Sequence, residues 1–206
     1  AMVDGLVGEL GLKPSQIAFF TQDDAYGMAG YNGGIQALEA MGFSAATALP
    51  HGRYPRNTIQ VEAGLAEIMD PRNDVQAVIM VGAYKPCAQF IRLAKKHRLK
   101  AVFINVSFVG SAALTKDLGS DGEGVVVTQV VPHFRADFAG VQDYRALVPE
   151  IEQGFVSLEG YMIARSFVAG LRGVQGKLTR DGFIDALEAG LPIDLGLGAP
   201  AVLSAN

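Results

Sequence analysis

Two hydrophobic patterns alternate along the first 131 residues of the chain. Continuous apolar runs are typical of strands buried on both faces of a sheet, and they occur at residues 17–20, 77–81, 101–104 and 124–131. A further strand is expected at 43–49, followed by a loop at 50–57. Apolar residues at helical spacing predict helices at 3–10, 24–41, 61–70, from about 84, and at 109–118. A repeat of roughly thirty residues predicts an α/β fold, a three-layer parallel sheet flanked by helices.

The pattern changes after Pro132. Apolar spacing predicts three helices, at 138–147, 157–171 and 180–189, with no convincing strand between them. Two of these helices have strongly apolar faces, which need a sheet to pack on, and the chain does not obviously supply a second sheet. The apolar residues are Leu158, Met162, Phe167 and Leu171 on the helix at 157–171, and Phe183, Ile184 and Leu187 on the helix at 180–189. We therefore expect a domain boundary at 132–137.

Composition excludes several classes of protein. A net charge of -4 argues against binding to nucleic acid or to an anionic membrane. No apolar run reaches the roughly 18–20 residues of a membrane span. The first residues, AMVDGLVGELG, lack the basic and long apolar segments of a signal peptide. Cys87 is the only cysteine, so no internal disulfide is possible, and we interpret it as a small buried hydrophobe.

Candidate binding residues follow the ends of three predicted strands. Tyr26 follows the first strand, Tyr84 the strand at 77–81, and Ser107 with Phe108 the strand at 101–104. Ligands of open parallel sheets bind beyond the carboxyl ends of the strands, so all four residues should lie at one edge. A tyrosine there can wall a pocket with its ring and still form a hydrogen bond. The alternative is that both tyrosines only pack against their own loops.

Catalytic and cofactor signals are weak by comparison. GVQGKLT at 173–179 has the wrong spacing for a P-loop and follows a helix where a P-loop follows a strand. The three histidines lie far apart and have no cysteine partners, which argues against zinc. No nucleophile–base pair is visible. We therefore expect no enzymatic activity, cofactor or metal, with a doubly wound enzyme that uses the same edge as the alternative.

Five stretches of the chain resemble one known family. They read IAFFTQDDAYGMAGYNGGIQALEAMGF, DVQAVIMVGAYKPCAQFIRLAKKH, FINVSFVGSAAL, GEGVVVTQVVP and EGYMIARSFVAGL. In order and spacing they are similar to the type I periplasmic substrate-binding proteins of ABC importers, in the leucine/isoleucine/valine-binding-protein-like branch. The resemblance implies two α/β lobes that clamp a ligand between them. It also implies that this chain is a fragment: the second lobe at 1–131, a crossover at 132–137, first-lobe helices at 138–195 and a return crossover at 196–206.

The resemblance also implies roles for the strand-end residues. Tyr26 matches a family tyrosine that stacks on or hydrogen-bonds the ligand, and Tyr84 matches the pocket-wall tyrosine of a Y-x-P block. Ser107 stands where amino-acid binders carry an acidic residue that pairs with the ligand ammonium. A hydroxyl cannot balance a desolvated ammonium as a carboxylate does, so this departure from the family pattern argues against recognition of an amino acid. Phe108 beside it indicates a more apolar or aromatic ligand.

The resulting hypothesis is an extracytoplasmic, periplasmic solute-binding protein that feeds an ABC importer. The ligand is expected to be a carboxylate with an apolar or aromatic body, or an amino acid. The implied partners are that small molecule and the membrane subunits of the importer, with no nucleic acid. The resemblance implies a first lobe whose main sheet is missing from this chain. Contacts between copies of the chain are one expected replacement for it. A ligand-sensing domain of a receptor or regulator is the alternative with the same fold.

Overall fold

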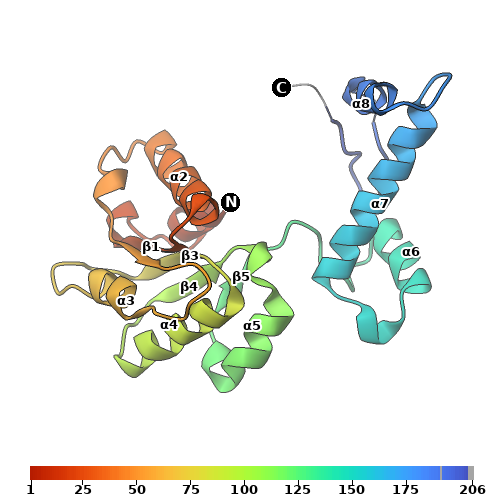
Figure 1. Cartoon of the computed structure of the whole chain (residues 1–206). Helices are drawn as coiled ribbons and strands as arrows, with labels where there is room; N and C mark the ends of the chain where they lie inside the picture. Colours follow the sequence, from red (N-terminus) through yellow and green to blue (C-terminus); the bar gives the residue numbers. More distant parts are fainter. Residues whose placement is uncertain (191, 204–206) are drawn as a thin grey trace. The chain divides into compact units, whose positions relative to one another are not determined.

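The computed structural model describes residues 1–190 and 192–203, and the chain forms two compact units. The first comprises Ala1–Thr128, and the second begins at Gln129. Figure 1 shows the sheet in the first unit and helices α6, α7 and α8 in the second. Among the described residues, no helix combines the length and apolar character needed to cross a bilayer. The assignment of the units to two lobes of a larger protein stays a prediction.

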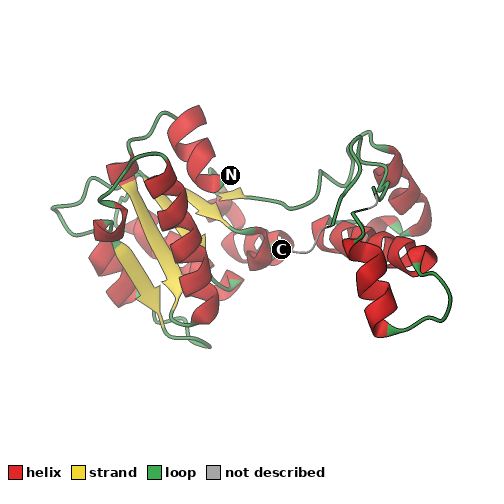
Figure 2. Ribbon diagram, turned by 90° about the horizontal axis from the view of Figure 1, so that it is seen from above, coloured by secondary structure: helices red, strands yellow, loops and turns green. Residues whose placement is uncertain are grey.

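The first unit is built on a five-stranded parallel sheet in the order β2-β1-β3-β4-β5. The strands of this sheet are drawn in yellow in Figure 2. Its strands are β1 (Ile17–Gln22), β2 (His51–Tyr54), β3 (Ala77–Val81), β4 (Val102–Asn105) and β5 (Val126–Val127). The helices around it are α1 (Met2–Asp4), continued by a π-helical turn, α2 (Ala25–Ala40), α3 (Glu62–Ile68), α4 (Tyr84–Lys96) and α5 (Ser111–Leu118). The predicted α/β class with a parallel sheet is confirmed.

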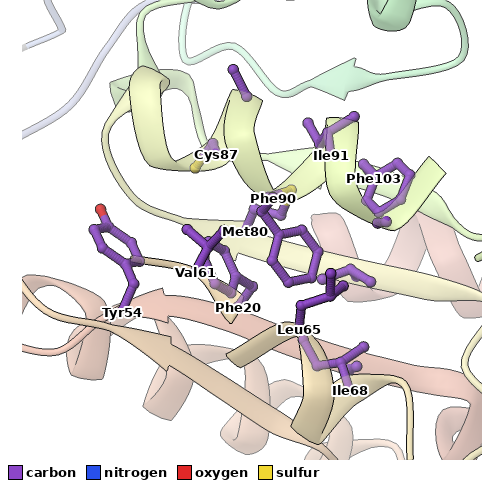
Figure 3. Close-up of a cluster of buried hydrophobic side chains, with 14 of the residues drawn as sticks. Phe20, Tyr54, Val61, Leu65, Ile68, Met80, Cys87, Phe90, Ile91 and Phe103 are labelled. Carbon is purple, nitrogen blue, oxygen red and sulfur yellow. The ribbon is translucent and has the colours of Figure 1, made fainter. Parts of the chain in front are cut away.

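Helices cover both faces of the sheet (Figure 1). On one face, α3, α4 and α5 bury an apolar cluster that includes Phe20, Met80 and Phe90 (Figure 3). The ring of Phe20 lies 4.1 Å from the ring of Phe90, between centroids. On the other face, α1, its π-helical turn and α2 pack against Phe19 and Ile79. Continuous apolar runs were correct strand signals because β1 and β3 are buried on both sides.

The prediction for residues 43–57 was wrong. Residues 43–50 form no strand; the side chains of Ala46 and Leu49 are buried, and this three-residue spacing belongs to the 3-10 turn at Ala46–Ala48. The strand is β2, which lies inside the expected loop and pairs only with β1. Its sequence, HGRY, carries little hydrophobic signal because an edge strand needs fewer buried side chains than a central strand.

The apolar run at 124–131 also gives less strand than expected. Only β5 pairs with β4, through Val126 and Val127, and the backbone N–H of Thr128 then donates to the carbonyl of Asn105 at 2.9 Å. Val126 is 43% exposed, so the run does not lie in the sheet interior. Apolar content alone predicted a longer strand than the edge position supports.

The second unit contains the three predicted helices, α6 (Ala139–Leu147), α7 (Phe155–Gly173) and α8 (Arg180–Glu188). Its small core consists of Val141, Tyr144, Leu158 and Met162. Gly170 lets α7 approach α8, because a side chain there would overlap Phe183 and Leu187. Phe167 remains 52% exposed within the chain, and Ile163 and Val168 on the same helix are also exposed. No part of the chain that the structure describes covers these three apolar side chains.

His51 in β2 gives the first unit a predicted dependence on pH. Its ring stacks on Tyr31 at 4.0 Å, and its Nε2 lies 2.8 Å from the Thr21 hydroxyl. Burial, followed by the nearby Arg53, lowers the pKa of His51 to about 4, against an opposing effect of Asp23. The unfolded chain, with a pKa near 6.5, binds the proton more readily. This contribution to stability is therefore present above about pH 6.5 and is lost as the pH falls towards 4.

We expect the free energy of unfolding to fall by about 1–3 kcal/mol between pH 7 and pH 4.5 through this residue. Urea unfolding at both pH values measures the change. The variant His51→Gln removes the titrating ring and should show a clearly smaller difference between the two conditions. An equal pH dependence in both proteins would assign the effect to other groups.

Candidate functional site

The strand order places a topological switch point between β1 and β3. The chain leaves β1 into α2 on one face of the sheet and leaves β3 into α4 on the other face. Such a divergence opens a crevice at the carboxyl edge of the sheet, where open α/β proteins bind their ligands. Tyr26 lies in the first turn of α2, and Tyr84 is the first residue of α4. Both predicted tyrosines therefore flank the switch point.

Tyr26 is held by a well-capped helix. The carboxylate of Asp24 accepts hydrogen bonds from the backbone N–H of Gly27 at 3.1 Å and from the side chain of Gln22 at 2.6 Å. The Tyr26 ring lies 5.4 Å from the ring of Phe108, between centroids. Its hydroxyl is buried, and burial raises the pKa of Tyr26 to about 12. At neutral pH the hydroxyl is therefore protonated and can donate a hydrogen bond.

Ser107 and Phe108 form the start of a short 3-10 turn after β4. Ser107 is half-buried, and the Phe108 side chain is 81% exposed. An exposed phenylalanine beside a half-buried tyrosine is a ready apolar surface for a ligand. The structure thus brings the rings of Tyr26 and Phe108 together. Tyr84 lies apart from this pair, at the start of α4 after β3.

Tyr84 lines a pocket of about 480 Å³ at the same edge. We call it the loop pocket; its lining residues are Gln22, Tyr54, Asn57, Thr58, Ile59, Ala83, Tyr84, Lys85 and Pro86. Neither Tyr26 nor the Ser107–Phe108 pair lines it. Sequence reasoning missed Tyr54 and residues 57–59 because it placed β2 too early. With β2 correctly placed, Tyr54 is one more tyrosine at a strand end.

Asn105 is a second residue that sequence reasoning missed. It ends β4, its side chain is fully buried, and neither atom of its amide has a hydrogen-bond partner among the described protein groups. The buried hydroxyl of Tyr26 likewise has no such partner. Buried polar groups without partners are costly, and they concentrate at functional sites. The polar residue that interrupts the apolar run FINV was the available signal.

We also searched the described residues for a metal site, a reactive cysteine and other hollows. They contain no cluster of three histidine, cysteine, aspartate or glutamate residues suited to a metal. Cys87 is fully buried, and burial raises the pKa of its thiol to about 12, so it is no thiolate at neutral pH. A larger hollow of about 860 Å³ lies in the second unit, open and lined by Arg135, Arg145 and Glu150.

Comparison with known proteins adds an independent line of evidence. A family model described as "Periplasmic binding protein" matches residues 1–206. A search of curated proteins found no match. Among solved structures, a possible leucine/isoleucine/valine-binding protein from Rhodopirellula baltica SH 1 is 44% identical, with a TM-score of 0.87 over 98% of this chain. This chain covers 56% of that protein.

Two further solved structures are similar. A substrate-binding periplasmic protein from Ralstonia solanacearum is 25% identical, with a TM-score of 0.75 over 96% of this chain and 56% of that one. A branched chain amino acid ABC transporter from Thermus thermophilus with bound valine is 15% identical. Its TM-score is 0.74, over 98% of this chain and 57% of that one. At that identity the last likeness concerns the fold alone.

Proposed function

Because this chain belongs to the periplasmic binding protein family, we propose that it is part of a solute-binding protein for an ABC importer. In this proposal it captures a small molecule at the carboxyl edge of its sheet without converting it. The observation that carries the proposal is the position of Tyr26 and Tyr84 on either side of the β1/β3 switch point. The family match supports a location in the periplasm or elsewhere outside the cytoplasm.

The chain spans 56% of the length of the Rhodopirellula baltica relative. We propose that a further lobe closes over the carboxyl edge of the sheet, and that its own sheet covers the exposed apolar residues of α7. Ile163, Phe167 and Val168 support this idea because a monomer rarely leaves several large apolar side chains of one helix in water.

The ligand class follows from the residues at the edge. The relative at 44% identity is described as a possible leucine/isoleucine/valine-binding protein, which favours a ligand with an aliphatic body. Ser107 offers a hydroxyl and no carboxylate, which disfavours an ammonium group at that position. We propose a small carboxylate with an apolar or aromatic body, and an amino acid is the competing ligand.

A thermal-shift screen tests the proposed function. The protein expressed from its complete gene would be heated with amino acids, aromatic and aliphatic acids, and the matching amides. A ligand that binds the folded state at 100 times its Kd raises stability by about 2.7 kcal/mol. Stabilisation by one class of solute, recovered unchanged by mass spectrometry, is expected. Chemical conversion of the solute would favour the doubly wound enzyme.

A further inference from the structure

The loop pocket has a rigid frame before any ligand enters. The hydroxyl of Tyr54 donates a hydrogen bond to Gln22 Oε1 at 2.9 Å and accepts one from the backbone N–H of Ala83 at 3.0 Å. The Tyr54 side chain is 1% exposed and stacks on Phe20. One buried phenol thus joins the ends of β1 and β2 to the residue before α4. A pocket built on such cross-links needs little ordering when it binds.

The outer wall of the pocket is the turn after β2. The Thr58 hydroxyl donates to the carbonyl of Pro55 at 2.7 Å, and Asn57 has a φ of 62°, in the left-handed region. Ile59 in this turn is 55% exposed, and Pro86, which also lines the pocket, is buried. The turn therefore presents an apolar side chain to a pocket whose other wall is also partly apolar.

Among the described residues, Lys85 is the only charged one that lines the loop pocket. The neighbouring cations are already paired: Arg53 lies 3.1 Å from Asp23, and Arg56 lies 3.8 Å from Asp24. Within the described part of the chain, Lys85 forms no ion pair. The Asp24 carboxylate is further occupied by Gln22 and the N–H of Gly27. The pocket therefore combines a partly apolar lining with one cation that has no acidic partner among the described residues.

We propose that the loop pocket binds a small monocarboxylate that lacks an ammonium group. Its carboxylate pairs with Lys85, and its apolar body lies against Ile59, Pro86 and the ring of Tyr84. A volume of about 480 Å³ is within the range of small-molecule pockets. An α-amino acid fits worse, because its ammonium would lie in a pocket whose only charge is positive. This inference rests on the proposed function and narrows its ligand class to acids without an ammonium group.

Three probes with one carbon skeleton test the inference: 4-methylpentanoate, its primary amide 4-methylpentanamide, and leucine. Their affinities would be measured by NMR titration of the ¹⁵N-labelled protein from its complete gene. We expect 4-methylpentanoate to bind at least about tenfold more tightly than either other probe. The shifted backbone signals should include those of Thr58, Tyr84 and Lys85.

Two lysine variants separate the charge from other effects. Lys85→Met keeps an unbranched side chain of nearly the same length and removes its charge, so the preference for the acid over the amide should disappear. Lys96→Met, in the last turn of the same helix, is the matched control and should retain that preference. Equal affinities for acid and amide in the unchanged protein, or an unchanged preference in Lys85→Met, would overturn the inference.

Failure of the inference can be told apart from failure of the proposed function. Tighter binding of leucine, with shifts at Tyr26 and Ser107 and none at Lys85, would overturn the loop-pocket assignment while supporting solute binding at the edge. Absence of binding by all three probes, combined with a thermal-shift screen in which no solute stabilises the protein, would contradict both proposals.

Discussion

The substitution Gly52→Ala is expected to lower the free energy of unfolding of the first unit by about 2–3 kcal/mol. Gly52 lies in β2 and is pressed against the backbone of Gly64 in α3. A methyl group at position 52 would overlap the carbonyl oxygen of Gly64, and backbone cannot rotate away as a side chain does. α3 would have to move away from β2. The same strand ends in Tyr54, which lines the loop pocket.

Urea unfolding followed by circular dichroism measures this effect. Gly33→Ala is a matched control, because Gly33 lies in α2 with open space around its Cα. Alanine is favoured over glycine by about 0.5–1 kcal/mol within a helix, so this control should be neutral or slightly stabilising. An equal unfolding midpoint for Gly52→Ala and the unchanged protein would show that β2 and α3 are less tightly packed than described.

Removal of the Tyr84 ring is expected to give the largest loss of binding. Tyr84→Ala should weaken the affinity for the solute by about 1–3 kcal/mol, the scale of a lost apolar wall at a binding hot spot. Tyr26 and Ser107 do not line the loop pocket, so Tyr26→Ala and Ser107→Ala should each weaken binding less than Tyr84→Ala. Calorimetric titration with a solute found by the thermal-shift screen measures each change.

Tyr84 also packs partly against the core of the first unit, so a loss of binding needs a control for stability. Tyr84→Phe keeps the ring and removes only the hydroxyl, and it should retain most of the affinity. Unfolding temperatures without solute would show whether Tyr84→Ala remains folded. A folded Tyr84→Ala protein with unchanged affinity would remove this residue from the binding site.

Central elements of the fold were predictable because their local and tertiary requirements agree. β3 is buried at all five positions, so its continuous apolar run had only one reasonable interpretation. The start of α2 depends on an equally local feature, because the side chain of Asp24 caps that helix by accepting from the backbone N–H of Gly27. β2 could not be predicted in the same way. Its pairing depends on β1 and on the close approach of two glycines, which are separated by 11 intervening residues.

The candidate site was predictable where a topological rule applies. The rule that ligands bind beyond strand ends selects Tyr26 and Tyr84 from the sequence, and both flank the switch point. Tyr54 and Asn105 could not be selected, because their importance lies in tertiary contacts or in the lack of them. Tyr54 is defined by its two hydrogen bonds, and Asn105 by an unpartnered buried amide.

The family resemblance predicted more than the hydrophobic patterns did. It predicted the membership that the family model and the Rhodopirellula baltica structure support. Helical periodicity located α6, α7 and α8 but could not state what covers Phe167, because a pattern on one helix does not identify its partner.

The most direct measurement is a crystal structure of the protein, expressed from its complete gene, with the solute that stabilises it most. The account predicts that the solute lies at the carboxyl edge of the sheet, in contact with the ring of Tyr26, Tyr84 or both. Its carboxylate should lie beside Lys85. A solute bound only at the opposite edge of the sheet, near Asp70 and Asn73, or only in the second unit, would contradict the account.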